Sequence, residues 1–416
     1  MEMTNRKVTF RMYPNATQES ALMDLKIHHQ QLYNWALKDR VSVYKNFGYG
    51  LSYSDQCKIN TGYRQRREGC LPNANAQSEQ VTLKRVDLAF KAFFRRVKKG
   101  EKPGFPRLKS VDRFSGWGYK SHGDGWKLFT DENKKGQHQH GYVRLSGVGD
   151  IKLRGQARNP GGIPKTAEVM HKQGKWLLSV TFAYQPGEIK RESGNKAKAL
   201  DWGVETYISL VDHEGNQEAI ENPRFLRQAR QRITVLQKDL ALAPKGSSAR
   251  RRIRRELGNA HAKVANKRKD YTHKKSAEII KDSALVAGEK LTPKSMTKSA
   301  KGTKETPGKN VKQKAGLNRE IQNVSPAALY SALKYKAEEA GISFEEAPTR
   351  TLKPSQRCPE CWKVVKKTLA TRHHQCDCGC SMPRDMASAT VVLKWALGIE
   401  PHAEQAGRGP ALETPR

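Results

Sequence analysis

Five cysteines lie within 23 residues of one another in the C-terminal part of this 416-residue sequence. Cys358 and Cys361 form a C-x-x-C pair, and Cys376 and Cys378 follow 14 residues later as a C-x-C pair. Four thiolates from two turns make the tetrahedral shell that Zn²⁺ prefers in closed structural sites. We expect these four to bind one structural zinc ion. Cys380 could take the place of Cys376, so the choice between these two ligands stays open. Such a zinc has no open coordination position, so it would hold a ribbon together and perform no hydrolysis.

Two adjacent histidines, His373 and His374, precede the second cysteine pair. Imidazole nitrogens can also bind zinc, but beside a complete thiolate set we expect these side chains to be exposed or to face phosphate. The crowding of the thiols favours a metal site over a disulfide framework in a protein that is expected to be intracellular. Reduced, metal-free cysteines are the alternative.

Three carboxylates stand next to the ends of expected strands and helices. Asp201 lies where one strand begins, Glu289 where a later strand ends, and Asp385 at the start of a helix just past the cysteines. Considered individually, each of these carboxylates would be read as a capping residue or a surface residue. If they converge, they could bind two Mg²⁺ ions about 3.5–4 Å apart, which activate water and stabilise the leaving oxygen in phosphodiester cleavage. Spacing in sequence alone does not establish that convergence.

The charge balance indicates a polyanionic partner. The sequence has 77 Lys and Arg residues against 41 Asp and Glu, a formal net charge of +36 and a pI near 10. Lys and Arg displace the counterions condensed on phosphate backbones, whereas an enzyme of small metabolites would not need this charge. One expected helix carries a run of charged side chains that are almost all positive. Like charges at close spacing destabilise a helix unless an anion binds over them. The nucleic-acid-binding candidates on it are Arg250, Arg251, Arg254, Arg255, Lys267, Arg268, Lys274 and Lys275.

The first half of the chain is expected to combine a β-rich unit with a helical insertion. Residues 7–13 alternate as a half-buried strand does, and an amphipathic helix begins near Thr17. From about 112 to 186, short alternating runs separated by glycines predict several strands, an antiparallel barrel or sandwich that the first strand could join. These strands are expected at 142–145, 151–154 and 176–184.

The second half is expected to follow a polar linker at 187–198. Two runs at 199–203 and 206–212 suggest a hairpin, and two long helices follow with a turn at 243–248 between them. Residues 292–316 are rich in Lys, Ser, Thr and Gly and predict a mobile loop. The other expected elements are a strand at 284–287, a helix at 327–337, a strand at 342–344, a helix at 385–395 and a disordered tail at 399–416.

No apolar run reaches the roughly 18 residues of a membrane-spanning helix, and the first residues have no apolar stretch after their basic residues. Secretion and membrane insertion are therefore disfavoured. We expect a cytoplasmic protein that is associated with the nucleoid when it is bound to DNA.

Five segments carry a family resemblance. They are Arg11–Pro14 with the following Gln18, Gly104–Lys109, Leu200–Gly203, Asn266–Glu289 and Pro354–Asp385. In this order they resemble the TnpB family of transposon-encoded, RNA-guided DNA nucleases and the related compact type V CRISPR effectors. The sequence departs from the family pattern at Trp202, where a small or aliphatic residue is common, and in its C-x-C pair, where the family has C-x-x-C.

The resemblance implies a RuvC nuclease domain with an RNase H-like fold, whose three acidic residues match Asp201, Glu289 and Asp385. It thus implies two catalytic Mg²⁺ ions beside one structural Zn²⁺. The presence of all three carboxylates argues against the relatives that act as nuclease-dead repressors.

The implied fold is a multidomain α+β architecture. Its parts are a wedge β-barrel at 1–14 and 112–190, a helical recognition domain at 15–111, a RuvC-like α/β nuclease domain at 195–349 and 383–398, a zinc ribbon at 350–382 and the tail at 399–416.

The implied activity is guide-RNA-directed cleavage of double-stranded DNA next to a short motif, by a monomer or an asymmetric dimer on one RNA. Two alternatives remain open at this point. One is a DNA-strand transferase, because transposases also use three carboxylates on an RNase H-like fold. The other is a guide-RNA-dependent repressor that does not cut.

Overall fold

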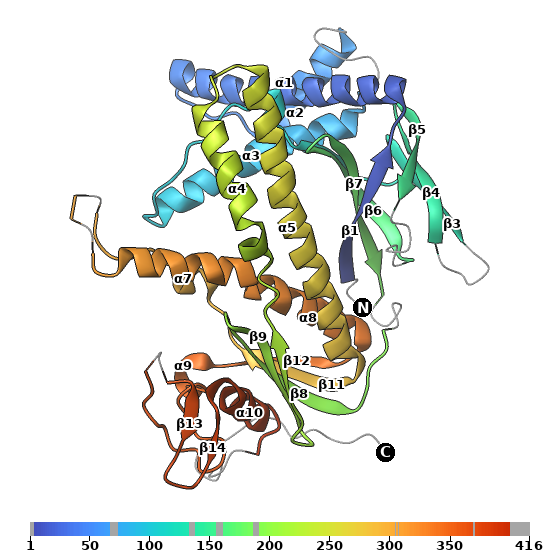
Figure 1. Cartoon of the computed structure of the whole chain (residues 1–416). Coiled ribbons are helices and arrows are strands. Elements are labelled where there is room, and N and C mark those ends of the chain that lie inside the picture. The colour runs from blue at the N-terminus through green and yellow to red at the C-terminus, as the bar shows by residue number, and fades with distance from the viewer. Residues whose placement is uncertain are drawn as a thin grey trace. The chain divides into compact units, whose positions relative to one another are not determined.

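The computed structural model describes residues 4–66, 74–132, 138–154, 161–185, 191–303, 305–306, 308–368 and 371–399. The chain divides into two compact units, Met1–Glu188 and Ile189–Arg416, each with its own sheet (Figure 1). The predicted disordered tail lies outside the described residues from residue 400 onward. Within the described residues, no helix is both long and apolar enough to cross a membrane.

The first unit is built on a seven-stranded antiparallel sheet in the order β2-β6-β7-β1-β5-β4-β3. Its strands are β1 (Thr4–Tyr13), β2 (Gly116–Tyr119), β3 (Trp126–Glu132), β4 (His138–Leu145), β5 (Gly149–Arg154), β6 (Ile163–Lys172) and β7 (Lys175–Tyr184). The prediction that the first strand joins the sheet is confirmed, because β1 pairs with β7 along one edge and with β5 along the other. All seven strands contribute side chains to one apolar core, so the sheet curves around that core. The sequence pattern missed β2, β3 and β6.

Three helices lie between β1 and β2 in the chain: α1 (Ala16–Phe47), α2 (Tyr53–Gln65) and α3 (Ala76–Lys98). Helix α1 begins with a capping box, in which Asn15 and Gln18 each accept a hydrogen bond from the other's backbone N–H. It ends at Gly48, which adopts the left-handed conformation that favours glycine. The helices share a core of their own that includes Leu83 and Phe114.

The second unit contains a five-stranded mixed sheet in the order β10-β9-β8-β11-β12. Its strands are β8 (Lys196–Trp202), β9 (Thr206–Asp212), β10 (Gln217–Glu221), β11 (Ser283–Glu289) and β12 (Ser343–Ala347). Strand β9 is antiparallel to both β8 and β10, while β11 runs parallel to both β8 and β12. The expected β8–β9 hairpin is therefore confirmed.

Helices cover both faces of this sheet. They are α4 (Phe225–Leu242), α5 (Ser248–Lys281), α6 (Pro293–Met296), α7 (Val311–Val324), α8 (Pro326–Ala340), α9 (Thr349–Leu352) and α10 (Arg384–Ala396). Apolar residues of α5 and α8 pack with Leu200, Ile208 and Val286 on one face of the sheet. Helix α10 packs on the other face. A small hairpin of β13 (His373–Gln375) and β14 (Ser381–Pro383) directly precedes α10 (Figure 1).

Two expectations for the second unit are wrong. The stretch at 292–316 is not all loop, since α6 and the first residues of α7 lie in it. Lys and Gln are good helix formers, and α7 is anchored by Ile321 and Val324, which are buried beyond the end of that stretch. Asp201 does not lie where a strand begins either. Strand β8 starts at Lys196, within the predicted linker, because its alternating lysines flank the buried Ala197 and Ala199.

Candidate active site and metal centre

The sheet of the second unit places two of the three candidate carboxylates side by side. Asp201 is the next-to-last residue of β8 and Glu289 is the last residue of β11. Leu200 pairs with Gly288 in the parallel β8–β11 ladder, so the residues that follow are neighbours in the same register. Neighbours in register on adjacent strands point to the same face of a sheet. Both carboxylates are half-buried at one end of the ladder.

The third carboxylate lies on helix α10, which packs on that same face of the sheet. The face is lined near the carboxylates by the small side chains of Ala199, Ala287 and Ala347, which share a core with Val391 and Val392 of α10. Small residues on the sheet allow a helix to approach closely. Asp385 lies in the first turn of α10 and is half-buried.

Asp201 lies within electrostatic interaction distance of both Glu289 and Asp385. Burial raises the pKa of Asp201 well above its usual range, and the negative charges of Glu289 and Asp385 raise it further. Burial also raises the pKa of Glu289 to about 7. Arg384 donates from Nε to Asp385 Oδ1 at 3.2 Å. Asp201 and Glu289 therefore resist ionisation, and a hard divalent cation bound to their oxygen atoms would stabilise the charged form.

These raised pKa values predict that the stability of the metal-free protein falls as the pH rises. Between the ordinary glutamate pKa of 4.5 and the folded value of about 7, Glu289 binds more protons in the folded chain than in the unfolded chain. The free energy of unfolding therefore decreases across that window and levels off above it. We expect the Tm of the protein in Mg²⁺-free buffer to drop between about pH 5 and pH 7.5, and Glu289→Gln to flatten this drop. Scanning fluorimetry at a series of pH values measures it, and parallel curves for the two proteins would contradict the assignment.

Tyr330 and Gly288 support this site, and the sequence pattern did not single them out. Tyr330 of α8 is buried, and its hydroxyl lies in the space that Gly288 leaves by having no side chain. Burial raises the pKa of Tyr330 well above its usual range, and Asp201 and Glu289 add to this shift, so the phenol stays neutral beside them. A glycine immediately before the last residue of a strand was the available signal, because it indicates close approach of another group.

Gly288→Ala is expected to destabilise the second unit. The new Cβ would lie 2.6 Å from the Tyr330 hydroxyl oxygen and 3.0 Å from its Cζ. Overpacking of this kind costs about 1–3 kcal/mol, and the strand shift would move Glu289. We expect a lower Tm in the single variant and partial recovery in the double variant with Tyr330→Phe, which removes the closest atom. If the double variant melts at the sum of the two single effects, the proposed clash is absent.

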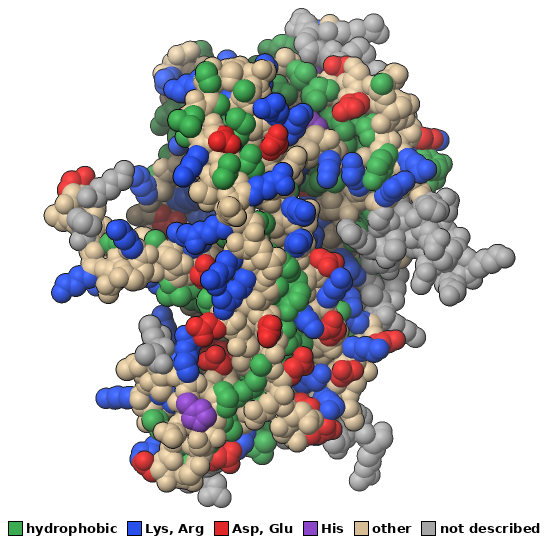
Figure 2. All heavy atoms as spheres, viewed as in Figure 1, with side chains coloured by type: hydrophobic (Ala, Val, Ile, Leu, Met, Phe, Trp, Pro, Cys, Tyr) green, Lys and Arg blue, Asp and Glu red, His purple; other side chains and the backbone are tan. Residues whose placement is uncertain are grey.

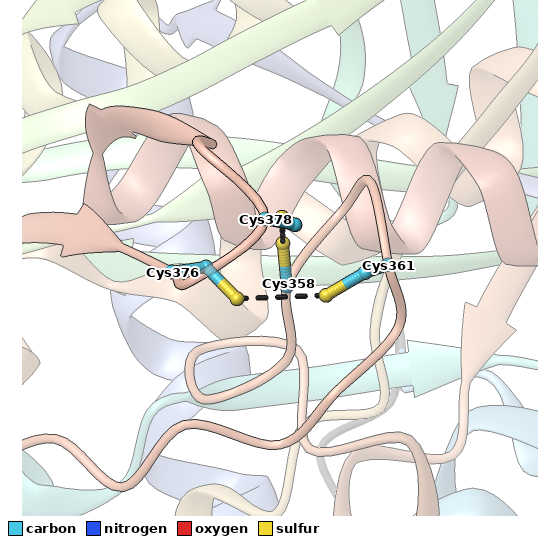
Figure 3. A group of neighbouring side chains, drawn as sticks. All are labelled: Cys358, Cys361, Cys376 and Cys378. Atoms are coloured by element: carbon cyan, nitrogen blue, oxygen red, sulfur yellow. Dashed lines mark hydrogen bonds between the residues drawn. The ribbon is translucent and has the colours of Figure 1, made fainter.

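The cysteine cluster has the geometry of a zinc site. The Sγ atoms of Cys358, Cys361, Cys376 and Cys378 all lie within 4.8 Å of one another. Figure 3 shows the four sulfurs pointing toward a common centre, with Cys358 and Cys378 at 3.6 Å and Cys361 and Cys376 at 3.5 Å. A tetrahedron with Zn–S bonds of about 2.3 Å has edges near 3.8 Å, so the set fits zinc.

The histidines beside this cluster behave differently from each other. His373 is exposed, as expected, and its Nε2 lies 2.9 Å from Ser381 Oγ. The expectation is wrong for His374, which is fully buried in β13. The pairing of β13 with β14 points alternate side chains to opposite faces, and this turns His374 inward.

The eight basic candidates all lie on α5, but they do not share one environment. Arg250 Nη1 donates to the carbonyl oxygens of Leu240 and Ala243 at the end of α4, and Arg268 Nη1 donates to those of Gln322 and Asn323 at the end of α7. These two side chains therefore hold neighbouring helix ends.

The other basic candidates on α5 are more open to a partner. Lys274 and Lys275 form ion pairs within α5, while Arg251, Arg254, Arg255 and Lys267 are exposed. Figure 2 shows Lys and Arg side chains over the α4–α5 hairpin.

Three family models match the chain. They are "Probable transposase" over residues 178–300, "Cas12f1-like, TNB domain" over 327–392 and "Helix-turn-helix domain" over 1–48. The first contains Asp201 and Glu289, and the second contains the cysteine cluster and Asp385. In the described part of residues 1–48 the chain forms strand β1 and the single helix α1.

Named relatives cover most of the chain. It is 28% identical over 297 residues to "Putative RNA-guided DNA endonuclease InsQ" of Escherichia coli (strain K12), covering 71% of this chain and 68% of the relative. It is 25% identical over 436 residues to "Putative RNA-guided DNA endonuclease" of Streptomyces pristinaespiralis, covering 100% and 98%. The fold is similar to that in the "Cryo-EM structure of the Cas12f1-sgRNA-target DNA complex", with a TM-score of 0.55 and 12% identity over 94% of this chain and 99% of that one. Taken with the motifs and the placement of their residues, these matches support the resemblance of the chain to the TnpB family.

Proposed function

We propose that this protein is an RNA-guided DNA endonuclease that cleaves DNA with a Mg²⁺-dependent RuvC site. The observation that carries the proposal is the convergence of Asp201, Glu289 and Asp385 from β8, β11 and α10. Its relatives are named as RNA-guided DNA endonucleases, which supports the same activity.

In this proposal the three carboxylates hold two Mg²⁺ ions, which would activate a water molecule and stabilise the leaving oxygen of the cut strand. The chain itself contributes position and environment. Small alanines bring α10 close to the sheet, and the ion pair with Arg384 orients the Asp385 carboxylate. The raised pKa values of Asp201 and Glu289 mean that a cation must displace protons from these carboxyls to bind, so occupancy of the site should increase with pH.

We propose that base pairing with the guide supplies sequence specificity, and that the protein recognises a short motif beside the target and holds the heteroduplex by its backbone. The exposed arginines of α5 are suited to phosphates, whereas Arg250 and Arg268 already bind helix ends. This proposal includes the domain boundaries that the sequence resemblance implies for the wedge domain, the recognition domain, the nuclease domain and the zinc ribbon.

The test begins with the RNA that copurifies with the protein. Sequencing it should give one dominant RNA, and changing a segment of that RNA should redirect cleavage to the matching DNA in the presence of Mg²⁺. Cleavage that is indifferent to the RNA sequence would contradict guided targeting.

Strand transfer is the second candidate, because the family model over residues 178–300 is described as a probable transposase. A transferase would join the cut end to a second DNA molecule in the same assay, whereas the nuclease leaves free ends. A protein that binds the target without cutting would be a guide-dependent repressor instead.

A further inference from the structure

We propose that the ribbon contains a second metal position, formed by Cys358, His374 and Cys380, which shares the Cys358 thiolate with the four-cysteine site. The ligand atoms of these three residues lie within 4.8 Å of one another, the same limit that the four thiols meet. The inference concerns the ribbon alone and does not depend on the nuclease assignment.

His374 is the observation that points to a ligand. Its side chain is fully buried, and among the described residues neither Nδ1 nor Nε2 has a hydrogen-bond partner. Leaving a buried polar group unsatisfied costs about 1–3 kcal/mol. A metal ion bound through one ring nitrogen would offset that cost, because neutral imidazole is a common zinc ligand.

One ion cannot use all of these donors. Zinc in closed sites takes four ligands, and the four-cysteine set already supplies them. Cys380 and His374 group with Cys358 and not with the other three thiols. A thiolate has lone pairs enough to bridge two ions, so a second zinc beside Cys358 would give Cys380 and His374 a role.

Charge also favours a second cation. Four thiolates around one Zn²⁺ leave two excess negative charges, and ionised Cys380 would add a third. A second Zn²⁺ reduces the excess to one negative charge. Lys367 lies close enough to Cys358 and Cys380 to interact with their charges, so it can balance the remainder.

Three protein ligands would leave the second ion with an open coordination position. A polar hollow of about 360 Å³ adjoins Cys380, lined by Gln375, Cys376, Asp377, Gly379, Cys380 and Ser381. Water or an exchangeable thiol can reach the ion from this side. The ligand chemistry, two thiolates and one imidazole, suits zinc and its spectroscopic probe Co²⁺.

The experiment is metal analysis of the full chain by plasma mass spectrometry after saturation with Zn²⁺ and removal of loosely bound metal on a desalting column. We expect about two ions per chain in the wild type and about one in both Cys380→Ser and His374→Gln. Cys57→Ser, which changes a cysteine of α2, is the matched control and should retain two. Saturation with Co²⁺ should give thiolate charge-transfer absorption that falls in the Cys380 variant.

One ion per chain in the wild type overturns the proposal, whatever the variants do. Two ions that persist in both variants overturn it as well. Cys380 is only partly buried and borders the hollow, so its serine variant should fold even if the His374 variant does not.

Discussion

Asp201→Asn is expected to abolish Mg²⁺-dependent cleavage of target DNA while guide RNA and target binding persist. The substitution removes one of the three carboxylates proposed to bind Mg²⁺, and we expect a loss of about 10³-fold or more, equivalent to about 4 kcal/mol of transition-state stabilisation. Binding should persist because we propose that basic side chains outside the three-carboxylate site hold the guide. Single-turnover cleavage and a gel-shift assay on the same preparations measure the two properties.

The Asp201 variant should also melt at a higher temperature than the wild type in Mg²⁺-free buffer at neutral pH. Burial and the charges of Glu289 and Asp385 disfavour ionised Asp201, and asparagine removes that penalty. Glu205→Gln is the matched control, because Glu205 is an exposed carboxylate in the adjoining β8–β9 turn. Full cleavage by Asp201→Asn would remove this residue from the site.

Cys358→Ser is expected to reduce zinc content and, through it, both ribbon stability and cleavage. Cys358 is fully buried and belongs to both ligand sets of the ribbon. Structural zinc contributes about 10–16 kcal/mol of apparent binding free energy in small domains, so losing a ligand should unfold the ribbon. The hairpin strand β14 ends at Pro383, and Asp385 follows two residues later, so an unfolded ribbon leaves the third carboxylate poorly held.

Zinc content, limited proteolysis and cleavage rate of Cys358→Ser should therefore change together. Cys57→Ser should leave all three unchanged, since Cys57 lies in α2 of the first unit. A wild-type protein purified without chelators that contains no zinc would contradict the metal assignment itself.

The sequence could predict those parts of the fold that depend on periodicity and on local spacing. The alternation at 7–13 predicted β1, the sequence predicted the two long helices α4 and α5 with the turn at 243–248 between them, and the C-x-x-C pair predicted the thiol cluster. These features depend on residues a few positions apart. The convergence of Asp201 and Asp385, which are 184 positions apart, came from family resemblance and then from the packing of α10 on the sheet.

The features that escaped prediction depend on partners far away in sequence. Strand β8 extends back to Lys196 because β11 and β9 supply its hydrogen bonds, although its lysines resemble a linker. Gly288 is explained only by Tyr330, 42 positions later. His374 was expected at the surface, and the strand pairing that buries it leaves no periodic signal in three residues.

The order of the three carboxylates along the chain has a consequence for biosynthesis. Translation delivers β8 and β11 first, then the ribbon, and only then α10 with Asp385. A nascent chain therefore has most of its basic surface and two of the three acidic groups before the site is complete. A product terminated inside the ribbon would have the exposed arginines of α5 without Asp385, and would compete with the full-length protein for its nucleic-acid partners without cutting them.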